Sequence, residues 1–258
     1  MHKSMGALLA GILVLGGGNL IRSGEEADGR ALVQKAIKAA GGADKLAKHT
    51  SATFKGKGTY YGMGYTSLNA AGAGVAIALA LPYSGIYAYQ WPDKFRMEIE
   101  GIFTIVFNGD KGWIKEGDQT KDMTKEQLAQ QLVDQKAGWM TTLLPLQNKA
   151  FQIKAIGEAK VGQHEALGVK VTRKDYPEVK LYFDKKTGLL VKSTFQTKSP
   201  EQKFKEVTQD AYYHNYRDVD GGKLPTKVVI NRDGRLFVEE EVSDYKAGKV
   251  DPKLFAKP

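Results

Sequence analysis

The chain has 258 residues, of which 42% are hydrophobic and 26% charged, a balance typical of a globular protein rather than a disordered one. It contains no cysteine, which excludes disulfide bonds, thiol nucleophiles, cysteine-based metal sites and a lipid anchor attached to an N-terminal cysteine. The formal net charge is +9, but lysine and arginine are scattered along the chain, which argues against a nucleic-acid partner. Contact with an anionic membrane surface fits the same charge equally well.

The N-terminus has the pattern of a secretory signal. Lys3 precedes the uncharged, apolar run Met5–Gly18, and polar residues with Glu25 and Glu26 come after it. The apolar run is too short to span a bilayer comfortably. We therefore expect residues 1–23 to be a signal segment, residues 24–258 to form one domain, and the protein to be periplasmic or otherwise exported. A retained N-terminal anchor is the alternative, because no clear cleavage motif precedes the domain.

The first folded element is predicted to be a helix, and most of the later elements are predicted to be strands. Apolar residues recur with helical spacing over Ala31–Ala40, and Gly41-Gly42 ends the pattern. From Ser51 onward the period changes to two, and Asn108-Gly109 and Asp233-Gly234 are strong hairpin signals. Counting the alternating segments gives about ten or eleven strands. The short turns between them favour antiparallel pairing over βαβ units.

One helical segment interrupts the strands. Thr124 followed by Gln127 fits a capping box, and apolar residues continue toward Pro145. We interpret Thr124–Gln147 as one or two helices that pack on the concave face of the sheet.

The segment Gly58–Pro92 carries no Asp, Glu, Lys, Arg or His, in a chain that averages one charge in four residues. One interpretation is a set of buried strands or a loose insertion. The other is the lip of an apolar cavity, or a segment that touches a membrane, because exposed apolar patches usually mark contact with something apolar. The sequence leaves both open.

Several segments together resemble one family. Tyr87–Gly101 (YAYQWPDKFRMEIEG), Ile105–Trp113 (IVFNGDKGW), Glu178–Lys192 (EVKLYFDKKTGLLVK) and Asp220–Ile230 (DGGKLPTKVVI) resemble the outer-membrane lipoprotein-sorting carriers of the LolA/LolB type. The resemblance extends over most of residues 31–245. Trp91 stands where typical carriers of this family place an arginine before the proline.

The resemblance implies a mainly β (α+β) fold, a curved antiparallel half-open barrel whose concave face is covered by a few helices. It also implies a soluble, monomeric carrier that is not an enzyme and needs no cofactor. In such a carrier a hydrophobic cavity holds lipid or the acyl chains of a lipoprotein. Candidate cavity residues, chosen by position and each equally suited to an ordinary core, are Ile86, Trp91, Phe95, Met97, Phe107, Trp113, Leu128, Leu132, Trp139, Leu143, Leu181 and Phe195.

No catalytic or metal motif accompanies this pattern. His2, His49, His164 and His214 are far apart in the sequence, and no nucleophile elbow or P-loop is present. The run DVDGG at Asp218 fits a hairpin turn better than a calcium loop. Two alternatives remain: a non-enzymatic interaction or structural module of the envelope with an exposed apolar patch, and a hydrolase whose two carboxylates meet only in the folded chain.

Overall fold

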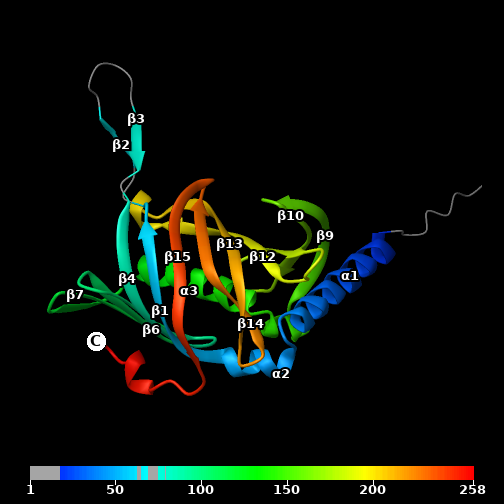
Figure 1. Cartoon of the computed structure of the whole chain (residues 1–258), viewed down its shortest axis with the longest axis horizontal. Helices are drawn as coiled ribbons and strands as arrows, with labels where there is room; N and C mark the ends of the chain where they lie inside the picture. Colours follow the sequence, from blue (N-terminus) through cyan, green and yellow to red (C-terminus); the bar gives the residue numbers. More distant parts are fainter. Residues whose placement is uncertain (1–17, 63–64, 69–74, 79) are drawn as a thin grey trace, which may run out of the picture.

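A computed structural model of the chain describes residues 18–62, 65–68, 75–78 and 80–258 (Figure 1). Residues 1–17 of the expected signal segment lie outside this range, and the expected boundary at residue 23 falls within the first helix. The helices are α1 (Gly18–Ala39), α2 (Ala43–Leu46) and α3 (Lys125–Thr141), with 3-10 turns η1 (Ala47–Thr50), η2 (Leu144–Gln147), η3 (Pro200–Gln202) and η4 (Pro252–Phe255). No helix in the described part of the chain is both long and apolar enough to cross a membrane.

The described residues also form fifteen strands. Their bounds are β1 (Ser51–Tyr60), β2 (Tyr65–Leu68), β3 (Val75–Ala78), β4 (Leu81–Gln90), β5 (Lys94–Ile99), β6 (Phe103–Asn108), β7 (Lys111–Glu116), β8 (Gln119–Asp122), β9 (Gln152–Val161), β10 (His164–Thr172), β11 (Val179–Asp184), β12 (Leu190–Ser199), β13 (Lys205–Val219), β14 (Gly222–Arg232) and β15 (Arg235–Ala247).

Thirteen of these strands form one antiparallel sheet in the order β8-β7-β6-β5-β4-β1-β15-β14-β13-β12-β11-β10-β9. The sheet is open, because β8 and β9 are its two edges and do not pair with each other. β1 pairs with β4 on one side and with β15 on the other, so the first and last strands meet in the middle. The predicted half-open antiparallel architecture is confirmed, with more strands than the sequence pattern indicated.

The short strands β2 and β3 pair only with each other, in a separate two-stranded sheet. Figure 1 shows this pair extending away from the main sheet, beyond the ends of β1 and β4. The uncharged segment Gly58–Pro92 is therefore divided between the two sheets. The end of β1 and all of β4 belong to the main sheet, and β2 and β3 form the separate one.

The turn signals of the sequence form the turns that they predict. β6 and β7 pair across Asn108-Gly109, with Asn108 opposite Lys111. Asp233 and Gly234 both have positive φ, 48° and 75°, as a tight hairpin between β14 and β15 requires. The capping box is also present, because Thr124 and Gln127 exchange hydrogen bonds of 2.9 and 3.2 Å at the start of α3.

The two halves of the concave face are filled differently. Over β9–β13, α1 and the C-terminal half of α3 close a solid core, whose largest buried side chains include Phe151, Met140 and Leu146. α1 approaches β9 closely, since a Cβ at Gly29 would lie 2.6 Å from the carbonyl oxygen of Ile153. On the outer face η4 packs against β5 and β6, with Phe255 fully buried beside Ala88.

Candidate functional site

A cavity of about 550 Å³ lies on the concave side of the other half of the sheet, beneath the N-terminal half of α3. Apolar side chains of the sheet and its connections form most of its wall. They are Leu81, Pro82, Met97, Ile99, Ile102, Phe103, Ile105, Ile114, Met123, Phe237 and Val238. Period-two alternation places Met97 and Ile99 of β5, and Phe103 and Ile105 of β6, on the cavity face, because successive side chains of a strand point to opposite sides.

The helix that covers this cavity presents polar side chains to it. Gln127, Gln130, Gln131 and Asp134 line the cavity and lie at positions i, i+3, i+4 and i+7, which is a single face of α3. The cavity thus has apolar walls on the sheet side and amide and carboxyl groups on the helix side. The remaining lining residues with polar groups are Tyr60, Tyr83, Tyr87, Glu201 and Arg232.

Gln130 and Asp134 form the centre of the polar side. Gln130 is only 4% exposed and donates a short hydrogen bond from Nε2 to the carboxylate of Asp134. The other carboxylate oxygen of Asp134 accepts a bond of 2.6 Å from the hydroxyl of Thr197 on β12. Burial raises the pKa of Asp134 to about 6, although Thr197, Arg232 and Gln130 act in the opposite direction. The Oε1 atom of Gln130 is buried and has no hydrogen-bond partner within the described residues.

A second polar group lies at the same end of the cavity. Arg232 of β14 forms an ion pair of 3.1 Å with Glu201, and its guanidinium stacks on the ring of Phe237 at 3.7 Å. Glu201 also accepts hydrogen bonds from the hydroxyls of Tyr60 at 2.9 Å and Ser199 at 2.7 Å. The positive charge of Arg232 is therefore balanced by Glu201, and Asp134 adds one more negative charge when ionised.

A buried carboxyl group stands behind the apolar wall. Glu240 of β15 accepts hydrogen bonds from the hydroxyls of Tyr83, at 2.8 Å, and Tyr87, and both tyrosines line the cavity. Burial raises the pKa of Glu240, while the two tyrosine hydroxyls lower it. Gly56 on the neighbouring strand makes room for this group, because a Cβ there would lie 2.6 Å from the carboxyl carbon of Glu240.

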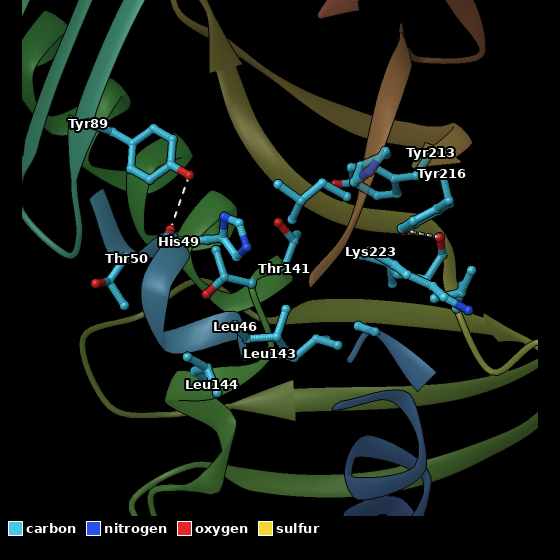
Figure 2. A pocket seen from close by; sticks show the side chains of 16 residues that line it. Leu46, His49, Thr50, Tyr89, Thr141, Leu143, Leu144, Tyr213, Tyr216 and Lys223 are labelled. Atoms are coloured by element: carbon cyan, nitrogen blue, oxygen red, sulfur yellow. Dashed lines mark hydrogen bonds between the residues drawn. The ribbon is translucent and has the colours of Figure 1, made fainter. Parts of the chain in front are cut away.

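A smaller pocket of about 150 Å³ lies at the C-terminal end of α3 (Figure 2). His49 lines it and is 6% exposed, and neither ring nitrogen has a hydrogen-bond partner in the described part of the chain. The hydroxyl of Tyr89 donates to the backbone carbonyl of His49 at 3.1 Å, the dashed bond in Figure 2. Burial lowers the pKa of His49, against the smaller effects of the Val219 carbonyl and Asp220. The imidazole is therefore neutral near pH 7.

This smaller pocket has few groups free to act. The hydroxyls of Thr141 and Thr142 donate to carbonyl oxygens of their own helix, each at 2.7 Å. No carboxylate lines the pocket alongside His49 in the described residues. The arrangement therefore offers His49 no acid partner for proton transfer.

Similarity to known proteins is found in structure rather than in sequence. Neither a protein-family model nor a curated protein matches the chain. A LolA superfamily protein from Nitrosomonas europaea superposes with a TM-score of 0.55 at 13% identity, covering 89% of this chain and 97% of that one. The chain has a LolA-like fold.

Two further solved structures share the LolA-like fold. A putative outer membrane lipoprotein-sorting protein domain from Vibrio parahaemolyticus matches with a TM-score of 0.51 at 10% identity, over 87% of this chain and 97% of that one. A DUF1329 family protein from Desulfovibrio piger matches with a TM-score of 0.53 at 12% identity, over 88% and 97%. The resemblance inferred from the sequence motifs is confirmed at the level of the fold.

The LolA-like fold separates the candidate cavity residues into groups. Met97 lines the larger cavity, and Leu143 lines the smaller pocket. Phe95 and Phe107 lie on the cavity face of β5 and β6, beyond its lining, with ring centroids 6.4 Å apart.

Four candidates, Leu143 among them, belong to the solid core over β9–β13. Leu181 is fully buried there, Phe195 is 8% exposed and Leu143 is 4% exposed. Trp139 packs at the margin of the same cluster, with its ring centroid 6.4 Å from that of Phe151. These side chains hold α3 on the sheet and do not line the larger cavity.

Two candidates lie on the outer face of the sheet. Ile86 is 40% exposed and alternates with Tyr87, which lines the cavity. Trp113 alternates in the same way with the cavity residue Ile114. Neither side chain is brought to the cavity.

The remaining candidates lie on the helix that covers the cavity or contact it. Leu128 packs over Gly112 of β7, where a Cβ would lie 3.1 Å from its Cδ1 atom, and Leu132 is half-buried on the same helix. Trp91 lies against Gly138 of α3, with its Cη2 atom 3.4 Å from the position of a Cβ there. Trp91, which precedes Pro92, thus contacts α3 through its ring.

The sequence prediction missed the polar cavity residues Gln130, Asp134, Glu201 and Arg232. The i, i+3, i+4, i+7 spacing of Gln127, Gln130, Gln131 and Asp134 was a readable signal, but such a stripe usually marks the solvent-exposed face of a helix. Glu201 and Arg232 carry no local signal, because they meet α3 only through the folding of β12 to β14.

Proposed function

We propose that the protein is an envelope carrier that takes the acyl chain of a lipid or of a lipoprotein into the cavity beneath α3. The observation that carries this proposal is the cavity itself, about 550 Å³ with a largely apolar wall. That volume falls within the range of about 300–1,000 Å³ typical of small-molecule sites. A hydrophobic core and the smaller pocket of about 150 Å³ occupy the other half of the concave face, so the larger cavity is a local feature of one half of the sheet.

The physical basis of binding is the removal of apolar surface from water. Each buried methylene contributes about 0.8 kcal/mol, so ten of them contribute about 8 kcal/mol before the cost of ordering the chain. The aliphatic side chains of the wall offer no hydrogen bonds, and the hydroxyls of Tyr60, Tyr83 and Tyr87 already donate to Glu201 and Glu240. An acyl chain therefore suits this wall better than a sugar or a nucleotide does.

The proposed activity is binding without chemistry. Asp134 and Glu201 share the cavity, which is the kind of carboxylate pair that a hydrolase would need. Both are held by protein donors, Asp134 by Gln130 and Thr197, and Glu201 by Tyr60, Ser199 and Arg232. This pattern suits a fixed recognition surface better than a group that gives and takes protons.

We propose contact with a membrane surface as part of this function. Two residues that line the cavity also expose apolar surface, Leu81 at 44% and Ile102 at 56%. The uncharged sequence of residues 58–92 and the net charge of +9 both favour approach to an anionic bilayer. Periplasmic or exported localisation, with residues 1–23 as the signal, is the setting in which such a carrier would act.

The same exposed residues favour a second candidate function, an interaction module whose apolar rim binds a partner protein. That alternative requires an apolar surface but no entry of a ligand into the cavity.

A pair of variants separates the two functions. Met97→Trp places a large ring in the cavity, whereas Ile86→Trp adds the same ring on the outer face of the adjacent strand. We expect a fluorescent long-chain fatty acid to bind the wild type and Ile86→Trp with similar affinity, and Met97→Trp at least about tenfold more weakly. Equal binding by all three, or by none, contradicts the carrier proposal.

A further inference from the structure

The polar side of the cavity includes four side chains that a ligand's head group could contact. Its members come from three parts of the fold: Gln130 and Asp134 from α3, Glu201 from η3, and Arg232 from β14. Within the described chain, every fully buried polar side-chain atom of this group has a hydrogen-bond partner in the protein, with one exception. The exception is Oε1 of Gln130, which is buried and unpartnered although its side chain lines the cavity.

The unpartnered atom is an acceptor because of its neighbour. Nε2 of Gln130 faces an oxygen of Asp134, and an ionised carboxylate can only accept, so the amide must present Nε2 to it. That orientation leaves Oε1 as the free end. A buried acceptor without a donor is costly, so a ligand that brings an N–H or O–H group gains most here.

The charges at the polar end of the cavity also favour a donor group on the ligand, one with a positive charge. Arg232 is paired with Glu201, so the charge left over when Asp134 is ionised is negative. A phosphate or carboxylate head would face that surplus and would leave Oε1 of Gln130 without a donor. A protonated amine satisfies both groups, since it carries positive charge and three N–H donors.

We propose that the preferred ligand is an amphiphile with a primary ammonium head, whose chain lies along the apolar wall and whose head donates to Gln130 and Asp134. This inference rests on the proposed carrier function and adds the chemical class of the ligand. Buried ionisable groups with shifted pKa values gather at functional sites, and Asp134 fits that rule.

The test compares four dodecyl amphiphiles below the concentrations at which they form micelles. They are dodecylammonium, dodecyltrimethylammonium, dodecanoate and methyl dodecanoate, each used to displace the fluorescent fatty acid from the full chain at pH 7.5. We expect dodecylammonium to bind about tenfold more tightly than the methyl ester and the trimethylated ion, which has the charge but no donors. Dodecanoate should bind most weakly.

Variants assign the preference to named side chains. Asp134→Asn and Gln130→Leu should each reduce the preference for dodecylammonium over the methyl ester to about threefold or less. Glu126→Gln removes the same charge from an exposed position of the same helix and should leave the preference unchanged. Circular dichroism establishes that each variant is folded, and the wild-type series alone tests the proposal if one is not.

The pH dependence provides a second readout. Asp134 is faced by Gln130 on its own helix, Thr197 of β12, Arg232 of β14 and Glu201 of η3. An alkylamine stays protonated below about pH 10, as lysine does. A change in affinity between pH 7.5 and 5 therefore reflects titration of the protein and not of the ligand. The affinity for dodecylammonium should fall toward pH 5 in the wild type and stay constant in Asp134→Asn.

The outcomes separate the two proposals. If all four amphiphiles bind equally, or dodecanoate binds best, the head-group inference is wrong and the carrier function stands. If none of the four amphiphiles binds, whether measured by displacement or by direct titration of the protein, both proposals fail.

Discussion

The residue that ties stability to the proposed function is Asp134. The pKa of Asp134 in the folded chain is about 6, above the ordinary value near 3.9. Between these two pH values the carboxyl group therefore keeps its proton in the folded chain and loses it in the unfolded chain. Its ionised form therefore costs stability above pH 6, and this cost disappears as the pH falls toward 4. A position that weakens the fold at neutral pH is one where a functional role is expected.

Replacing Asp134 with asparagine tests this cost. We expect Asp134→Asn to be more stable than the wild type at pH 7.5, by up to about 3 kcal/mol from a shift of roughly two pKa units. The gain should vanish near pH 4, where the wild-type carboxyl is also protonated. Urea denaturation at both pH values measures it, and an equal difference at pH 4 and 7.5 would contradict the assigned ionisation.

His49 should show the opposite slope. Its pKa is lowered by burial, so the unfolded chain binds its proton first as the pH falls below about 6.5, and stability is lost there. We expect His49→Gln to lose less stability than the wild type between pH 7.5 and 5.5. His214, whose pKa is also lowered, remains in the variant, so the dependence should shrink rather than disappear. Thermal melts at the two pH values provide the comparison, and an unchanged slope would show that His49 does not titrate in this way.

At the scale of elements, α3 decides where the cavity lies. Its N-terminal half covers β7 through Leu128, and its C-terminal half joins the solid core through Met140. Gly138 lies between these parts, against the ring of Trp91. The distance between this helix and the sheet should therefore respond to the size of residue 138.

Two substitutions at Gly138 should have opposite effects. Gly138→Ala removes a helix-destabilising residue and brings its Cβ to an ordinary contact of 3.4 Å with Trp91, so we expect a gain of about 0.5–1 kcal/mol. Gly138→Leu would press on the same ring and should cost about 1–3 kcal/mol. Chemical denaturation measures both, and a stable leucine variant would mean that α3 does not rest on Trp91.

The elements were largely predictable from the sequence because their signals are local. The period-two alternation, the Asn108-Gly109 and Asp233-Gly234 turns and the capping box at Thr124 each depend on neighbouring residues. The number of strands was underestimated, since alternation is weak in short strands such as β8, which is almost entirely polar.

The site was less predictable because it depends on which face of each element meets which neighbour. Met97 lines the cavity, whereas Ile86 and Trp113 lie a single step along their strands from the lining residues Tyr87 and Ile114. On α3 the apolar stripe of Leu128 and Leu132 was expected to face the cavity, whereas the glutamine stripe lines it. Period alone cannot tell a polar face directed at solvent from one directed at a ligand.

At the scale of the whole molecule, the positions of the exposed apolar residues distinguish the cavity from the rest of the surface. Leu81 and Ile102 line the cavity and are exposed, whereas Ile156, an apolar residue that is 39% exposed, lies on the edge strand β9. If the protein is the proposed carrier, apolar exposure at the cavity would serve transfer to a bilayer, while exposure on β9 would not.

Vesicle binding distinguishes the two positions. We expect Leu81→Asp and Ile102→Asp each to weaken association with anionic phospholipid vesicles several-fold, because each places a negative charge at the apolar rim. Ile156→Asp introduces the same charge on β9 and should have little effect. Co-sedimentation with vesicles measures the bound fraction. Equal losses in all three variants would indicate a general charge effect instead of contact through the rim.

The central claim is that the cavity beneath α3 holds an acyl chain, and the most direct measurement is mass spectrometry of what the purified protein carries. The wild type and Ile86→Trp, prepared without detergent and extracted with organic solvent, should each yield about one acyl amphiphile per chain, and Met97→Trp little or none. A wild type that carries nothing, or a Met97→Trp variant that carries as much as the wild type, would contradict the assignment of this cavity as the ligand site.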